Sequence, residues 1–137
     1  MSSRALAVSV LAVCFIFAPF AASGSQLRNL EEAQRDLEQW LGAAGVQRVK
    51  QARSEQEMYG VIGLIEAISL TNRWHLWENP PLARYFKSIG VTEPHDMVGI
   101  VSATYWCKLH GKPFRLRERA ARLQRIYREE AANERSG

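Results

Sequence analysis

The sequence predicts an all-α fold, a compact single-domain bundle of five to six short helices. Apolar residues recur at helical spacing from Leu30 to Leu41. The proline-led motifs Asn79-Pro80-Pro81 and Thr92-Glu93-Pro94 are typical of helix starts. No segment offers a convincing strand partner to any other, and an isolated strand would leave its backbone groups unpaired. We therefore expect one helical domain over residues 25–132.

Residues 1–24 are predicted to be a cleaved secretory signal peptide. Arg4 provides the positive start, an apolar stretch follows from Ala5 to Ala18, and Ala21-Ala22-Ser23-Gly24 supplies the small residues of a cleavage site. About 14 apolar residues make a helix of roughly 21 Å, shorter than a bilayer core of about 30 Å. We expect a periplasmic or secreted protein, with a lipoprotein acylated at Cys14 as the alternative.

The first helix has a clear start. Asn29 is a good N-cap, and Glu32 stands where a capping box needs a carboxylate. Gly42 and Gly45 are expected to end this helix, and a weaker amphipathic helix is expected over residues 46–57.

The segment from Tyr59 to Leu70 is almost entirely apolar, and its length favours a buried helix. Glu66 is its only charged residue. A buried carboxylate must pair with a cation or take up a proton. Glu66 is therefore expected either to extend its carboxylate to water or pair with an Arg such as Arg73 or Arg84, or to be a buried acid with a raised pKa.

Three further helices follow. The first runs from Asn79-Pro80-Pro81 to Gly90, and the second runs from Pro94 to about Leu109. The second is apolar on most sides and should therefore be central. The last helix is expected over residues 116–132, with a frayed, disordered tail at 133–137.

The chain has a net charge of +4, and its basic residues gather near the end. Eight Lys and Arg lie between Lys108 and Arg128, opposed only by Glu118. The last helix is expected to turn its arginines to water, either as a solvated face or as a weak contact for an anionic membrane surface or partner. Nucleic acid is disfavoured because no aromatic residues interleave with the cations. The arginines concerned are Arg115, Arg119, Arg122 and Arg125.

No catalytic, cofactor or metal motif is present. The chain has three His and two Cys, without an HExxH motif, a GxSxG elbow or a glycine-rich phosphate loop. Cys107 lies in an apolar helix and is expected to be a buried thiol. An acid–base enzyme remains an alternative, with Glu66, His75, His95 and Asp96 as its candidate groups.

The richest candidate binding segment runs from Trp74 to Gly111. It holds three of the four Trp and all three His. The two Trp near its start are either core residues or exposed anchors, since Trp is common at both kinds of position. The start of the helix at Pro94 also offers free N–H groups to an anion. The candidate binding residues are Trp74, His75, Trp77, Glu78, Asn79, His95 and Asp96.

These residues predict a non-enzymatic binding or interaction module for an unknown protein or a small anionic ligand. Alternatives are a small hydrolase or transferase, and a protein held at a membrane surface by its basic helix or by lipid on Cys14.

A series of motifs in this segment is similar to a known pattern. It reads Asn72, Trp74-His75-Leu76-Trp77, Leu82 to Phe86, Gly90-Val91, Pro94-His95-Asp96-Met97-Val98 and Leu109-His110-Gly111-Lys112-Pro113. In these motifs the chain resembles a bacterial family, domain of unknown function 6794. The resemblance implies a helical fold and carries no activity.

The chain departs from that family pattern at three positions. Thr71 stands in place of an Arg, His95 in place of an Asp, and Val98 in place of a Ser. If those three side chains form a polar site in relatives, the site is degraded here. If they only cap a helix and pair with each other, His95 and Thr92 can substitute.

Overall fold

A computed structural model describes residues 24–137 of the chain, and the predicted signal peptide lies almost entirely outside them. The described part is helical and contains no strand, which confirms the predicted all-α class. Its elements in order are η1 (Gly24–Gln26), α1 (Leu30–Gln51), α2 (Glu55–Val61), α3 (Leu64–Arg73), η2 (Leu76–Glu78), α4 (Pro81–Ser88), α5 (Pro94–Leu109) and α6 (Leu116–Ser136).

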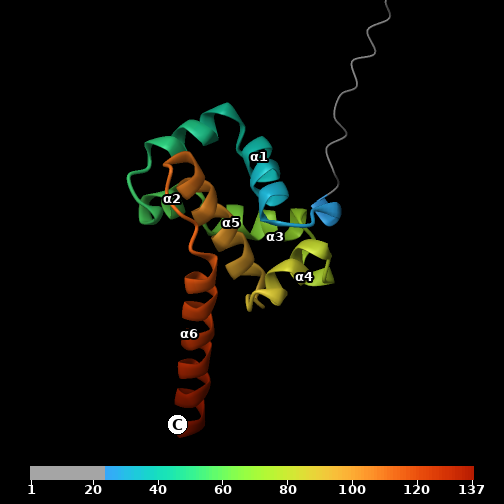
Figure 1. The fold of residues 1–137 in the computed structure, drawn as a ribbon, viewed down its shortest axis with the longest axis vertical. Helices are drawn as coiled ribbons and strands as arrows, with labels where there is room; N and C mark the ends of the chain where they lie inside the picture. Colours follow the sequence, from blue (N-terminus) through green and yellow to red (C-terminus); the bar gives the residue numbers. More distant parts are fainter. Residues whose placement is uncertain (1–23) are drawn as a thin grey trace, which may run out of the picture.

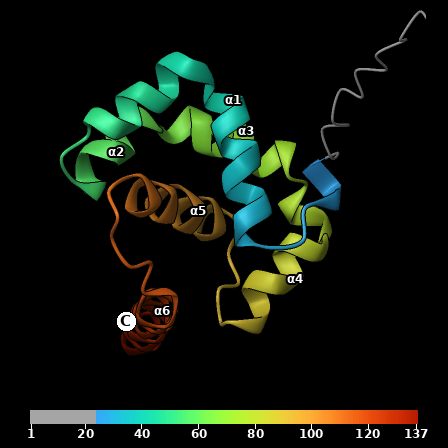
Figure 2. The same ribbon diagram turned by 45° about the horizontal axis from the view of Figure 1, so that its top comes forward.

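Helix α5 forms the centre of the bundle. Every residue from Met97 to Cys107 except Gly99 is buried, so the helix is enclosed on most sides, as its composition predicts. Helices α1, α2, α3 and α4 all pack against it. Figure 2 shows α1 and α2 arching over α5, with α6 set on the other side.

Helix α1 begins as predicted and is interrupted at Gly42, the first of the two predicted glycines. The Asn29 side chain accepts a hydrogen bond from the Glu32 N–H at 3.0 Å, while the Glu32 carboxylate reaches the N–H of Arg28 at 2.7 Å. Gly42, with φ of 67° and ψ of 178°, has a non-helical backbone that divides α1 into two helical segments, the second of which runs to Gln51. A second helical segment after the predicted glycine is therefore confirmed, but it ends at Gln51 and not at residue 57, because α2 begins separately at Glu55.

The apolar segment from Tyr59 to Leu70 is not one buried helix. Helix α2 ends at Val61, Gly63 is extended, and α3 starts at Leu64. Because only one side of α3 faces α5, Leu70 is buried while Leu64 and Ile65 are 75% and 77% exposed. Apolar composition alone could not show which side of the helix would be covered.

Glu66 is not the buried acid that the sequence suggested. It lies half-buried in the first turn of α3, where the positive end of the helix dipole favours a carboxylate. Within residues 24–137 it forms no ion pair, so the expected pairing with Arg73 or Arg84 is also absent.

A buried carboxylate ties α1 to the end of α3. Asp36 is 6% exposed and accepts two hydrogen bonds from the Arg73 guanidinium, at 2.7 and 3.0 Å. It accepts a third from the Trp74 indole N–H, also at 2.7 Å. Burial alone would raise the pKa of Asp36, but the bonds from Arg73 and Trp74 outweigh it and hold that pKa below its usual value.

Helix α6 leaves the body of the bundle. Its start is packed, with Ala120 buried, and its C-terminal half projects away, as Figure 1 shows. The helix continues to Ser136, so residues 133–136, which were expected to belong to a disordered tail, are helical. The projecting half of the helix consists mainly of exposed charged residues and alanines. Such a composition suits a helix surrounded by water, where charged side chains one turn apart can pair.

Replacing Asp36 with alanine should lower the free energy of unfolding by about 3 kcal/mol. The change leaves the buried indole N–H and part of the guanidinium without an acceptor, at about 1–3 kcal/mol for each unsatisfied group. Urea denaturation measures the change. Arg35→Ala, which removes an exposed ion pair with Glu31, should cost less than about 0.5 kcal/mol. Equal losses in the two variants would contradict the role given to Asp36.

Candidate binding surface and groove

The two neighbouring tryptophans of the candidate segment have opposite environments. Trp74 is 0% exposed and its indole is held by Asp36, whereas Trp77 is 61% exposed. Between them the backbone turns sharply, because His75 adopts a left-handed conformation with φ of 52° and opens η2. The turn directs Trp77 outward. Trp74 is therefore a core residue, and Trp77 is a surface residue.

Trp77 is held against the start of α5. Its ring meets the His95 ring edge-on, with centroids 5.6 Å apart and planes at 80°. The Nδ1 atom of His95 lies 3.5 Å from Oγ1 of Thr71 in the last turns of α3. His95 thus joins η2, α3 and α5 at one point of the surface. The positions of Thr71 and His95, two of the departures from the family pattern, are in contact.

Of the other predicted loop residues, some are exposed on the surface and one holds the loop in place. His75 is exposed, with its Nδ1 3.1 Å from the Glu78 carboxylate. Asn79 fastens the loop to α4, since its Oδ1 accepts a hydrogen bond from Lys87 at 2.7 Å and its carbonyl oxygen accepts one from Arg84 at 2.9 Å. Asn79 therefore shapes the loop.

Exposed apolar side chains that the sequence did not predict stand on α3, in addition to Trp77 of η2. Leu64, Ile68 and Thr71 recur at helical spacing on one side of this helix, and Thr71 leads to His95 and Trp77. The α3 strip, as we call it, consists of Leu64, Ile65, Ile68 and Trp77, all of which are exposed. An amphipathic analysis of α3 alone, started at Gly63, could have shown this side.

A groove with a volume of about 500 Å³ lies between α2, α5 and α6. Gly99 of α5 lines it, and a Cβ atom added there would meet no atom within 4 Å. The residues around it are Glu55, Gln56 and Tyr59 of α2, His95, Asp96, Gly99 and Ile100 of α5, and Arg119, Arg122, Leu123 and Ile126 of α6. Sequence reasoning missed this groove, although it singled out four of these residues.

Two of the groove's four charged residues are paired with each other. Arg119 donates to the Glu55 carboxylate with both terminal nitrogens and to the Phe114 carbonyl through Nε at 2.7 Å. These bonds lower the pKa of Glu55. The expectation that Arg119 faces water is therefore wrong, because a carboxylate 64 positions earlier in the chain draws it inward.

The remaining charged groups of the groove differ. Asp96 accepts a short hydrogen bond from the Tyr127 hydroxyl, which raises the pKa of that tyrosine. Arg122 is exposed and has no ion pair among the described residues. Of the other predicted arginines, Arg125 is exposed and Arg115 lies 3.8 Å from Glu118.

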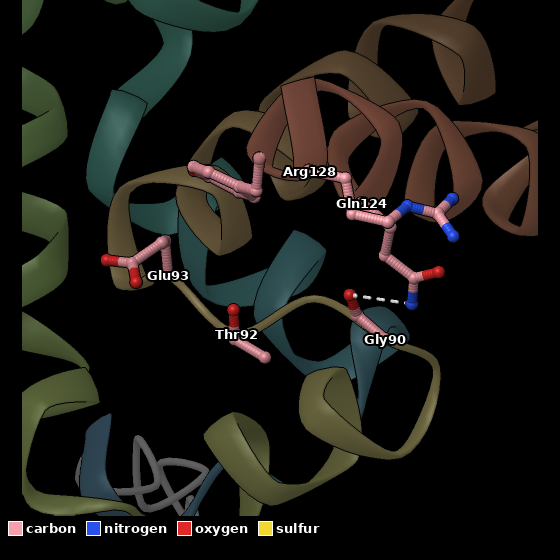
Figure 3. A pocket seen from close by; sticks show the side chains of 6 residues that line it. Gly90, Thr92, Glu93, Gln124 and Arg128 are labelled. Carbon is pink, nitrogen blue, oxygen red and sulfur yellow. Dashed lines mark hydrogen bonds between the residues drawn. The ribbon is translucent and has the colours of Figure 1, made fainter. Parts of the chain in front are cut away.

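A second hollow of about 550 Å³ separates α6 from the loop between α4 and α5. Figure 3 shows Thr92 and Glu93 on the loop, with Gln124 and Arg128 opposite on α6. The Gln124 amide donates to the Gly90 carbonyl at 3.3 Å across it. This bond helps to fasten α6 to the bundle.

The candidate acid–base groups do not converge. His95 and Asp96 line the groove between α2, α5 and α6, whereas His75 pairs with Glu78 and Glu66 lies in the first turn of α3. In residues 24–137 no three His, Cys, Asp or Glu side chains are placed to hold a metal ion. Burial raises the pKa of the Cys107 thiol, which favours its unreactive form.

These features define a small all-α domain with an exposed apolar strip and a separate mixed groove. Residues 28–109 match the family model of a domain of unknown function, DUF6794, and the chain belongs to that family. No curated protein and no solved structure shows significant similarity to it. None of the helices in residues 24–137 combines the length and apolar character needed to cross a bilayer.

Replacing each of the two tryptophans with alanine should distinguish the core residue from the surface residue by the loss of stability. Trp74→Ala should lower the free energy of unfolding by about 3–5 kcal/mol, since it leaves a large cavity and frees a buried carboxylate. Trp77→Ala should change it by less than about 0.5 kcal/mol, as for other surface substitutions. Guanidinium denaturation followed by circular dichroism measures both. Comparable losses would show that Trp77 also supports the core.

Proposed function

We propose that the protein is an exported, non-enzymatic binding module that holds a partner protein on the α3 strip. One observation carries this proposal. Leu64, Ile65 and Trp77 are the three most exposed large apolar side chains among the described residues, and all belong to the strip. Exposed large apolar side chains that lie in one part of the surface mark interaction sites more often than scattered ones do.

Covering the strip would release substantial free energy. Full burial of one Leu or Ile side chain is worth about 1.5–3 kcal/mol, and Trp is among the residues that most often dominate binding energy. Trp77 is also held in place by His95. A partner would therefore meet an anchor that loses little conformational freedom on binding.

The charges beside the strip indicate the partner's chemistry. Glu66 adjoins Ile65, and the Glu78 side chain next to Trp77 is 73% exposed. Of the cations nearby, Arg73 is engaged by Asp36, and Arg84 and Lys87 donate hydrogen bonds to Asn79. The carboxylates of Glu66 and Glu78 therefore remain beside the strip. They fit a protein segment with an apolar face flanked by basic residues.

Photo-cross-linking in the native cell tests this proposal. A benzoylphenylalanine placed at Ile65 or at Trp77 should give the same dominant protein adduct, and one placed at exposed Gln47 of α1 should not give it. With that partner purified, Ile65→Asp should weaken binding at least about tenfold, as for an interface anchor, and Gln47→Asp should not. A different adduct at each position, or an adduct with lipid or a second copy, would contradict the proposal.

Export makes a second prediction. We expect the mature chain to begin after Ala22, Ser23 or Gly24, as signal cleavage requires. Gly24 lies against the backbone at the end of α3, since a Cβ atom added to it would lie 2.0 Å from the Arg73 carbonyl oxygen. The folded domain therefore extends to the region of the predicted cleavage site. Cell fractionation with intact-mass analysis measures both location and start. A lipidated mass would indicate Cys14 instead, and a cytoplasmic chain retaining Met1 would refute export.

A further inference from the structure

The groove between α2, α5 and α6 is distinct from the α3 strip, and we infer that it binds a small amphipathic carboxylate. The ligand class is an aliphatic chain that ends in one carboxylate group. The groove's volume of about 500 Å³ falls within the range of roughly 300–1,000 Å³ that is common for small-molecule sites. This site does not depend on the partner proposed for the strip, since the strip residues do not line it.

The inner surface of the groove suits an aliphatic chain. Ile100 and Leu123 line it, and Tyr59 and Ile126 stand half-exposed at its sides. Gly99 leaves the space between them open, since a Cβ atom there would meet nothing within 4 Å.

Glycine at position 99 lowers the stability of α5, and close packing does not explain why a glycine stands there. Glycine in the interior of a helix is less stable than alanine by about 1 kcal/mol. Gly99 lies well inside α5, and no neighbour in the fold approaches its Cα closely enough to exclude a side chain. The one thing a side chain at this position would fill is the groove.

One cation of the groove is open to a carboxylate. Glu55 is paired with Arg119, whereas Asp96 keeps its negative charge and accepts a hydrogen bond from Tyr127. Arg122 remains the cation without an ion pair in the described part of the chain. A guanidinium can bind both oxygens of a carboxylate at once, which favours this anion.

The third wall of the groove does not come from the family match. That match ends at residue 109, and Arg122 lies on α6, which begins at Leu116. Family membership therefore does not bring the groove with it. The site is assembled where α6 lies against α2 and α5.

Calorimetric titration of the purified protein with dodecanoate, below its micelle concentration, tests this site. We expect saturable binding of one molecule. Gly99→Leu should weaken binding at least about tenfold by filling the groove, and Arg122→Gln should weaken it about fivefold or more. Dodecanol, which has the same chain without the charge, should bind at least about fivefold more weakly.

Two matched variants and one mutation-free measurement complete the test. Gly60→Leu changes a helical glycine with open space around it in α2, and Arg125→Gln removes an exposed arginine outside the groove. Both should leave affinity within about twofold, as for surface changes. In NMR spectra, dodecanoate should shift the Gly99 amide and leave the amide of Gly42, a residue of α1 that does not line the groove, unchanged. Unsaturable binding, equal effects of Arg122→Gln and Arg125→Gln, or an unshifted Gly99 amide would overturn the inference.

Discussion

The buried carboxylate of Asp36 is the constraint on which the surface of this domain depends. It holds the Arg73 guanidinium and the Trp74 indole at the same time, so the last turn of α3 can lie in one orientation only. With Trp74 fixed inward, the left-handed turn at His75 sends the chain back and leaves Trp77 in solvent. The exposure of Trp77 is thus a consequence of the ion pair between Asp36 and Arg73.

A second buried hydrogen bond fixes the position of α1, this time against α5. The Gln34 side-chain amide donates to Oγ1 of Thr104 in α5 at 2.9 Å. Gln34 and Asp36 are two residues apart on α1, and they reach different neighbours. Directed hydrogen bonds discriminate between packings that apolar contacts would tolerate equally. Together they define how α1 lies on the bundle, in a chain whose described part has only the single, unpaired cysteine Cys107.

The sequence predicted what local chemistry determines. The N-cap at Asn29 and the starts at Pro81 and Pro94 are confirmed because each depends on residues a few positions apart. The break at Gly63 was missed because apolar residues on both sides of it suggested one buried helix. Both candidate tryptophans lay in the predicted segment, but their opposite exposure depends on Asp36, 38 positions before Trp74. The groove was missed since three helices distant in sequence form it.

On α6 as well, a charged residue held by an ion pair determines the direction in which a nearby exposed residue points. Arg119 is held inward by Glu55 and by the Phe114 carbonyl, which fixes the rotation of α6 about its axis. Arg122 follows three residues later, so its direction from the axis differs by about 60°. The fixed rotation therefore places it at the rim of the groove. The basic helix α6 thus contains cations of two kinds. Arg119 holds the helix against the bundle, and its position determines where Arg122 remains without an ion pair among the described residues.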